Sequence, residues 1–206
     1  MHASRRSTGR RDGDVTASLP PILRGPRLDL VLVTVEQVLS RDGTVDPVPL
    51  GFDDPHDVLH PDRSPLAFRI EQLRRDPTVN PWLLRVAVLR SPAPVIVGLG
   101  NFHDRPDARG MVEIGYRVLP AHRGRGFGRE IATTMWSGAA ACPDVHWLRA
   151  SVRPDNAPSL AIIRGAGFVK VGEQDDPQDG LEWVFELPAR DFGPESRGRS
   201  GIATEA

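Results

Sequence analysis

The segment that decides the fold reads His122-Arg123-Gly124-Arg125-Gly126-Phe127-Gly128-Arg129. A strand pattern ends just before it, at Leu119, and an amphipathic helix pattern begins at Gly126. Glycine permits positive φ and lets a ligand approach the backbone closely. The first amides of a helix have no intrahelical partner, and the helix dipole adds partial positive charge there. The segment therefore predicts an anion cradle, strengthened by Arg123, Arg125 and Arg129.

Two common nucleotide-binding motifs do not fit this cradle. A P-loop requires Gly-Lys-Ser/Thr after its glycines, whereas Gly128 is followed by Arg129 and Glu130. A dinucleotide-binding motif requires glycine or alanine at position 129 or 131, where the chain has Arg129 and Ile131. A plain strand-to-helix turn with its arginines in solvent is the structural alternative.

The patterns around the cradle alternate between strands and helices. Strands are predicted at 28–34, 82–89, 95–102, 111–119, 146–152, 168–172 and 181–187. Helices are predicted at 65–76, 126–141 and 157–163. Ser64 is the expected cap of the first, with Pro65 at its first helical position, and Asn156 is the expected cap of the last. The proline-rich segment 43–63 reads as a loop or a broken short helix. This order predicts one mixed α/β sheet, partly antiparallel and partly parallel, flanked by helices.

The length of 206 residues suits one domain, at about 22–188, between two tails. The tails, residues 1–21 and 189–206, are rich in arginine, glycine, serine and acidic residues, a composition typical of disorder. A targeting peptide is the alternative at the basic N-terminus, although that segment lacks the apolar run of a secretory signal.

Composition excludes several functional classes. The formal net charge is −1, which gives no electrostatic case for nucleic acid or an anionic membrane as a partner. No apolar run approaches the roughly 20 residues that span a bilayer. The single cysteine, Cys142, fits a reducing compartment, so a cytoplasmic location is expected. His56 and His60 lie among prolines without a clear third ligand, so no metal site is predicted.

Three segments together resemble a known superfamily. Arg123-x-x-Gly126-x-Gly128 matches the Gln/Arg-x-x-Gly-x-Gly/Ala signature of the GNAT acetyltransferases. The run from Val112 to Pro120 resembles the strand before that signature, and the run from Val152 to Ser159, followed by Gly167-Phe168, resembles the later strand and helix. The resemblance covers about residues 95–187. The Asn156-x-x-Ser159 pattern is most similar to the RimJ/RimL branch.

The resemblance implies an acetyl-CoA site without a metal. The co-substrate would lie where two parallel strands, at 112–119 and 146–152, splay apart, and backbone groups near Val118 would pair with its pantetheine arm. Asn156 and Ser159 would lie beside that arm, although Asn156 also reads as a plain helix cap. Arg123 would add charge to the cradle, whose amides would hold the pyrophosphate: those of Gly124, Arg125, Gly126, Phe127, Gly128 and Arg129.

Glu113 is the candidate general base. Some members of the superfamily place a glutamate on this strand, and here it alternates with the apolar Val112 and Ile114, so it faces the opposite side. A solvent-facing glutamate is the alternative. Many members carry a tyrosine as general acid in the helix after the asparagine, whereas this chain has Ile163. Water, the substrate's own proton or another residue must then protonate the leaving thiolate.

These residues predict an acyltransferase that moves an acetyl group from acetyl-CoA to a primary amine by direct attack. A non-catalytic acyl-CoA-binding or sensing module is the alternative, favoured by Ile163, and a nucleotide-binding protein is a third interpretation. The acceptor stays open among protein N-termini, lysines, polyamines, aminoglycosides and small amino-acid-like amines. The near-neutral net charge weakly disfavours a strongly cationic one. A homodimer is also left open.

Overall fold

The computed structural model describes residues 18–54, 56–60, 65–177 and 180–193. Ser64 and the outer parts of both predicted tails, 1–17 and 194–206, lie outside the described residues. Just beyond the predicted domain limits of 22–188, Leu19 is buried, and the ring of Phe192 lies 5.8 Å from that of Trp136. The domain boundaries stay a prediction.

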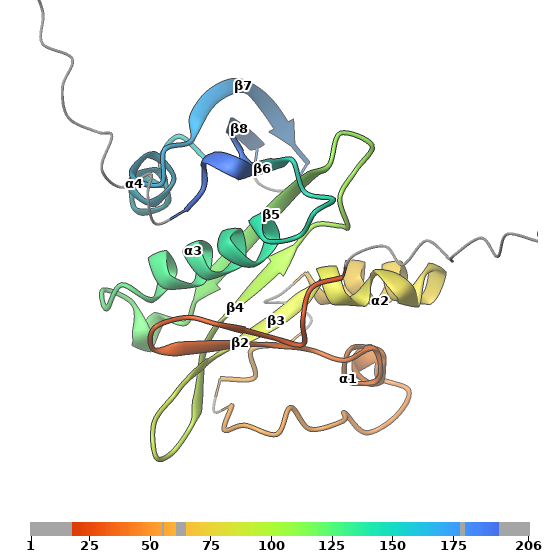
Figure 1. Ribbon diagram of the computed structural model, residues 1–206. Coiled ribbons are helices and arrows are strands. Elements are labelled where there is room, and N and C mark those ends of the chain that lie inside the picture. The colour runs from red at the N-terminus through yellow and green to blue at the C-terminus, as the bar shows by residue number, and fades with distance from the viewer. Residues whose placement is uncertain (1–17, 55, 61–64, 178–179, 194–206) are drawn as a thin grey trace, which may run out of the picture.

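Within the described residues, eight strands form one sheet in the order β1-β2-β3-β4-β5-β6-β8-β7 (Figure 1). All neighbouring strands are antiparallel except β5 and β6, which are parallel. The predicted mixed α/β class is therefore confirmed. The bounds are β1 Ile22–Arg24, β2 Leu28–Leu32, β3 Leu84–Leu89, β4 Val95–Phe102, β5 Met111–Val118, β6 Trp147–Val152, β7 Val169–Asp176 and β8 Gly180–Pro188.

Helices cover both sides of the sheet (Figure 1). Helices α3 (Phe127–Ala140) and α4 (Ala157–Gly165) lie on one side, and α1 (Val35–Leu39) and α2 (Leu66–Arg75) lie on the other. Helix α3 approaches the sheet closely, because a Cβ atom at Gly100 of β4 would lie 2.4 Å from the Sδ atom of Met135. Short 3-10 turns complete the fold: η1 Ser40–Asp42, η3 Pro77–Trp82, η4 Pro120–His122 and η5 Ala189–Asp191. Within the described ranges, every helix is too short or too polar to span a bilayer.

Strands β5 and β6 separate along their length. Both are fully described, and they pair over three positions, Met111–Glu113 with Trp147–Arg149. Beyond these positions β5 continues to Val118 beside β4, and β6 continues to Val152 beside β8. The sheet therefore opens between the two central parallel strands, as the resemblance implied.

One edge of β5 faces this opening. The carbonyl of Glu113 accepts from the amide of His103 at 2.9 Å, so the backbone of Glu113 points toward β4. Backbone groups of successive residues in a strand alternate between its two edges. The backbone groups of Ile114, Tyr116 and Val118 therefore point away from β4, toward β6 and the opening. The Val118 carbonyl accepts a hydrogen bond from Nε of Arg123.

Some element boundaries differ from the sequence-based predictions. The strand predicted from Trp82 begins at Leu84, because Pro77–Trp82 forms a 3-10 turn with Pro81 inside it. The strand predicted at 28–34 ends at Leu32, because Thr34 caps α1 through a capping box with Gln37. Pro65 occupies the N-cap of α2 instead of its first helical position, since its carbonyl accepts the first intrahelical bond, from the amide of Arg69.

Candidate active site

The glycine segment forms the predicted cradle at the start of α3. Gly124 and Gly126 have φ of +74° and +78°, a conformation that strongly favours glycine. Gly126 is the N-cap of α3, and no side chain among the described residues caps this helix. Residues 123–126 are exposed. The first amides of α3 are thus open to an anion, which fits the pyrophosphate of a CoA molecule.

The three cradle arginines are not equivalent. The Nε atom of Arg123 donates to the carbonyl of Val118 at 3.2 Å, which ties the loop to the end of β5. Arg125 and Arg129 are exposed beside the helix start, where they add positive charge. Arg129 also lies near α4, because its Nη2 atom would be 3.7 Å from a Cβ atom at Gly165.

A cavity of about 350 Å³ lies at the opening between β5 and β6. Tyr116 and Trp136 line it from the side of α3, where a Cβ atom at Gly128 would lie 3.4 Å from Cε2 of Tyr116. Glu113 and His103 line it from the other side, and a Cβ atom at Gly115 would lie 3.4 Å from Nε2 of His103. The cavity thus has walls from both faces of the sheet. Its other lining residues are Ile114, Gly115, Ala150, Ser151, Val152, Arg153, Asn156, Ser159, Ile163, Gln174, Asp176 and Glu182.

Glu113 lies in this cavity with a histidine beside it. Its side chain is 13% exposed, and its Oε2 atom lies 3.9 Å from Nδ1 of His103. The pKa of His103 is lowered, chiefly because the surrounding protein removes part of the ring from water, although 51% of the side chain stays exposed. Arg69 lowers the pKa further. Glu113 and Asp176 act in the opposite direction and raise the pKa of His103. The imidazole therefore favours its neutral form next to a carboxylate.

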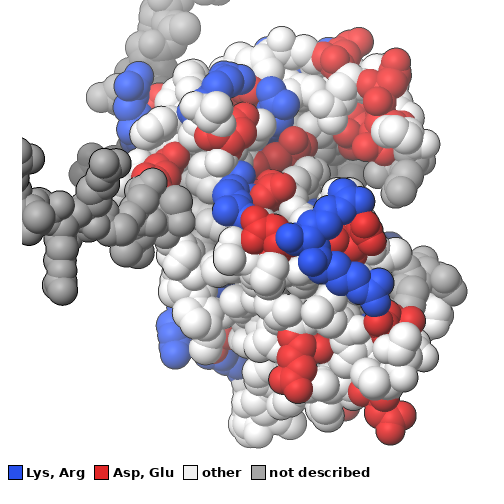
Figure 2. Space-filling view, turned by 90° about the vertical axis from the view of Figure 1, so that its right-hand side faces the viewer, with Lys and Arg blue, Asp and Glu red and all other residues white. Residues whose placement is uncertain are grey.

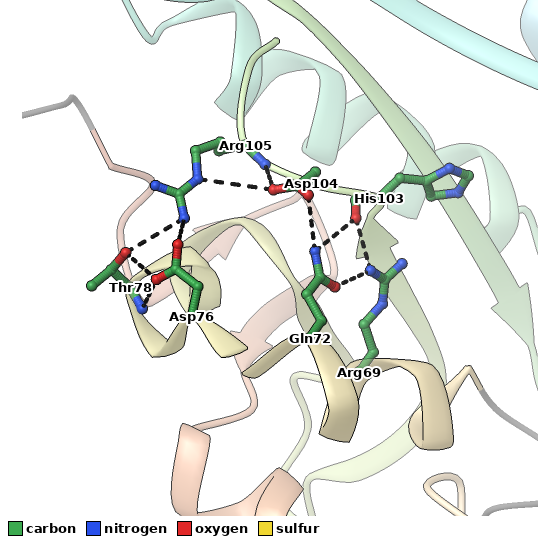
Figure 3. Close-up of polar contacts among 7 residues, drawn as sticks. All are labelled: Arg69, Gln72, Asp76, Thr78, His103, Asp104 and Arg105. Carbon is green, nitrogen blue, oxygen red and sulfur yellow. Dashed lines mark hydrogen bonds and ion pairs between the residues drawn. The ribbon is translucent and has the colours of Figure 1, made fainter. Parts of the chain in front are cut away.

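A polar network holds the backbone of His103 (Figure 3). Arg69 of α2 is buried, and its Nη1 atom donates to the His103 carbonyl at 2.7 Å. Burial lowers the pKa of Arg69 to about 10, which still leaves it charged at neutral pH. Gln72 bridges the same carbonyl and the carboxylate of Asp104. Figure 3 shows the imidazole of His103 pointing away from this network, which leaves the ring free to line the cavity.

A second polar group faces the cavity from the side of α3 and α4. The Tyr116 hydroxyl donates to Oγ of Ser159 at 3.2 Å, and burial raises the pKa of Tyr116, so the phenol stays protonated. Asn156 caps α4 by accepting from the amide of Ser159 at 3.2 Å. Asn156 thus caps α4, as expected, and also lines the cavity. Ile163 is 2% exposed, and its hydrocarbon side chain offers no hydroxyl.

Among the described residues that line the cavity, carboxylates outnumber arginines and lysines. Glu113, Asp176 and Glu182 line it from β5, β7 and β8. Arg153 also lines it, but its guanidinium makes a bidentate pair with Asp155. Figure 2 shows Asp and Glu side chains at the upper right of its face, with Lys and Arg side chains to their left, at the level where Figure 1 places β7 and β8. The local field of this cavity therefore attracts positive charge.

Comparison with known proteins agrees with this geometry. A sequence model of the acetyltransferase (GNAT) domain matches residues 52–169. The chain belongs to the GNAT acetyltransferase family. Among curated proteins it is similar to the uncharacterized N-acetyltransferase p20 of Bacillus licheniformis, with 24% identity over 49% of this chain and 57% of that protein. It is also similar to an N-acetyltransferase 9-like protein of Nematostella vectensis, with 33% identity over 36% of this chain and 38% of that protein. The GNAT chain thus spans about half the length of these curated relatives, or less.

Solved structures share the GNAT fold at low identity. A GNAT family acetyltransferase from Bacillus anthracis superposes with a TM-score of 0.55 and 15% identity, over 82% of this chain and 99% of that one. RimJ of Mycobacterium smegmatis, solved in complex with CoA-disulfide, superposes with a TM-score of 0.53 and 18% identity. The match covers 86% of this chain and 90% of that one. The ribosomal-protein-S5-alanine acetyltransferase of Vibrio fischeri superposes with a TM-score of 0.56 and 14% identity. The match covers 84% of this chain and 99% of that one. These likenesses bear on the fold, and the assignment to the RimJ/RimL branch stays a prediction.

The structure brings most of the sequence-predicted site residues together. Glu113, Asn156 and Ser159 line one cavity. The cradle from Arg123 to Arg129 begins α3, and Val118 links the two because it ends β5. Three further cavity residues, His103, Tyr116 and Asp176, were not among the site residues predicted from the sequence. His103 had a sequence signal, since it follows an apolar strand directly. Among the described residues, no group of three or more His, Cys, Asp or Glu could hold a metal ion.

Proposed function

We propose that this GNAT protein is an N-acetyltransferase that moves the acetyl group of acetyl-CoA to a primary amine by direct attack. One observation carries the proposal: a single cavity passes through the opening in the sheet, with a carboxylate on one side and a hydroxyl pair on the other. A reaction that removes a proton from one reactant and returns a proton to the other requires such a pair of groups.

The chain's own groups fit the donor. The cradle amides and Arg123, Arg125 and Arg129 would hold the pyrophosphate. The backbone of Tyr116 and the amide of Val118, which point toward the opening, would pair with the pantetheine arm as a neighbouring strand does. When bound, acetyl-CoA supplies an activated thioester carbonyl. A backbone amide of β5 at the opening would stabilise negative charge on that carbonyl oxygen.

Glu113 would accept the proton of the attacking amine, directly or through water. An alkylamine must be neutral to attack, and the lysine amine has a reference pKa of about 10.4, so most of it is protonated at pH 7. The neutral imidazole of His103, 3.9 Å from Glu113, supports this role because it leaves the carboxylate free to take a proton. Arg69 holds the backbone of His103 through its carbonyl.

The Tyr116–Ser159 pair would return a proton to the departing thiolate. The family's usual tyrosine is replaced by Ile163, but the phenol of Tyr116 reaches α4 from β5 and meets Ser159 at 3.2 Å. Because burial raises the pKa of Tyr116, the group remains a proton donor across the neutral range.

The acceptor we propose is an amine that carries a second positive charge. Asp176 and Glu182 line the cavity together with Glu113, so one carboxylate can serve the reacting amine while the others attract a second cation. This local field outweighs the near-neutral net charge of the chain, which on its own disfavoured a cationic acceptor. Diamines and basic peptides both meet this description.

The test is an assay for free thiol with acetyl-CoA and a panel of amines. Release of CoA with at least one amine, together with an acetylated product identified by mass spectrometry, is the expected result. The second candidate is a non-catalytic acyl-CoA-binding module, which the loss of the usual tyrosine at Ile163 favours. Tight CoA binding without thiol release for any amine would establish that alternative.

A further inference from the structure

The anion cradle is in contact with a distant part of the chain. The turn between β1 and β2, Gly25-Pro26-Arg27, lies against the first turns of α3. A Cβ atom at Gly25 would lie 2.7 Å from Oγ1 of Thr134 and 3.0 Å from Oε1 of Glu130, so glycine allows the close approach. The hairpin and the start of α3 thus form one packed unit.

Arg27 makes three kinds of contact at this unit. Its Nε atom donates to Oε2 of Glu130 at 2.8 Å. Its Nη1 atom donates to the carbonyl of Arg125, inside the cradle, at 3.1 Å. Its guanidinium lies over the ring of Phe127, 4.6 Å from the ring centre. One side chain therefore contacts the loop, the first residue and the first turn of α3.

Glu130 would otherwise oppose the binding of an anion. It lies in the first turn of α3, it is 6% exposed, and a carboxylate at that place repels a phosphate. In the structure both of its oxygens are engaged: Oε1 accepts from the amides of Arg27 and Leu28 at 2.5 and 2.8 Å, and Oε2 accepts from Arg27 Nε. The charge of Glu130 is thereby paired with that of Arg27.

We infer that Arg27 is a positioning residue for the pyrophosphate cradle. It neutralises Glu130 and holds the Arg125 carbonyl, and so it keeps the amides of Gly126, Phe127 and Gly128 directed outward. The inference rests on the proposed use of acetyl-CoA and adds a residue outside the GNAT signature, about 100 positions before it. Preorganised donors bind more tightly because they lose less freedom on binding.

Calorimetric titration with CoA tests the inference. Arg27→Ala is expected to raise the Kd for CoA about tenfold, since one preorganising charged contact is lost. Arg24→Ala is the matched control, because it removes the same charge from the same hairpin and Arg24 is exposed. An unchanged Kd for Arg27→Ala, or an equal rise for Arg24→Ala, overturns the inference.

A double variant guards against a failure to fold. Arg27→Ala leaves a buried carboxylate without its cation, whereas Arg27→Gln combined with Glu130→Gln removes both charges and leaves the net charge of the site unchanged. This double variant should also bind CoA about tenfold more weakly if Arg27 positions the loop. Wild-type affinity in a folded double variant would refute the positioning role.

A second donor separates positioning from general damage. Acetylpantetheine carries the thioester but lacks the pyrophosphate and the nucleotide. Arg27→Ala should lower kcat/KM for acetyl-CoA about tenfold through KM and leave acetylpantetheine unaffected. Equal losses with both donors contradict the inference. If wild-type protein does not bind CoA, the proposed function fails, whereas wild-type binding with an unaffected Arg27→Ala variant refutes this inference alone.

Discussion

The Nδ1 atom of His103, at the end of β4, lies 3.9 Å from the Oε2 atom of Glu113 on β5. The two backbones are also joined, because the His103 amide donates to the Glu113 carbonyl at 2.9 Å. Both side chains line the cavity at the opening of the sheet. Because the two side chains are so close, a change in the charge of Glu113 should alter the pKa of His103, which can be measured.

Glu113→Gln should lower kcat by about 100-fold and leave CoA affinity nearly unchanged, because the amide keeps the shape but cannot take a proton. Raising the pH should recover part of the rate, since solvent then deprotonates the amine. Steady-state kinetics from pH 6 to 10 measure this, with the exposed Glu71→Gln on α2 as a control. Full kcat at every pH would show that Glu113 is not the base.

The pKa of His103 should lie below its ordinary value of about 6.5. Glu113→Gln and Asp176→Asn should each lower it further, because each change removes a negative charge that raises the pKa. Titration of the histidine ring resonances by NMR gives the values, and His103→Gln identifies the signal. A pKa above 6.5, or one that rises in Glu113→Gln, would contradict the arrangement.

Tyr116 is the only tyrosine in the sequence, so its ionisation can be followed alone by tyrosinate absorbance. Its pKa should exceed about 10, because burial disfavours the phenolate. Tyr116→Phe should remove the signal and lower kcat by about tenfold or more with little change in CoA affinity. A Tyr116→Phe variant with wild-type kcat would exclude the phenol as the proton donor.

Gly128→Pro should weaken CoA binding more than Gly128→Ala. Gly128 is the second residue of α3, where proline is tolerated but removes the amide, whereas alanine keeps it. Proline at Gly126 is a poorer test, because that residue has φ of +78°, which proline cannot adopt. Calorimetry on both variants, after circular dichroism shows that they are folded, measures the difference. Equal affinities would mean that the Gly128 amide does not hold the pyrophosphate.

Asp176→Asn combined with Glu182→Gln should reduce kcat/KM for a diamine by about tenfold, because the second cation loses its carboxylate partners. A monoamine of equal length should be affected much less. The comparison of 1,5-diaminopentane with pentylamine measures this preference, and it should weaken as salt is raised. Wild-type protein that acetylates both amines equally would rule out a requirement for a second charge.

Much of the fold could be predicted from local patterns. The hairpin between β3 and β4 has prolines in its turn, and the apolar stripe of α3 includes Ile131 and Met135, so these elements appear in the sequence itself. Strand β1 has three residues with one buried side chain, Leu23, which is too short for a periodic signal. Helix α1 has five residues, and its one clear signal is the Thr34–Gln37 capping box, which could have been recognised.

The site was predictable only in part. Alternation along β5 placed Glu113 opposite the buried Val112 and Ile114. Its side chain lines the cavity and is 13% exposed. The approach of His103 and Asp176 depends on how β4 and β7 are arranged around the opening, which no local pattern encodes. The contact of Tyr116 with α4 likewise depends on tertiary packing. Arg27 was missed for the same reason, since its partners lie about 100 residues away.

The narrow seam between β5 and β6 has a mechanical consequence. Three paired positions join a five-stranded half of the sheet to a three-stranded half. A ligand that occupied the opening in the manner of a strand would complete the lateral hydrogen bonding between the two halves of the sheet. Occupancy and resistance to unfolding would then rise together, by about 2.7 kcal/mol at a ligand concentration 100 times the Kd. Cleavage by a protease near the seam should slow as the free energy of unfolding rises. Bound acetyl-CoA would then contribute to the stability of the sheet and withdraw that contribution when it leaves.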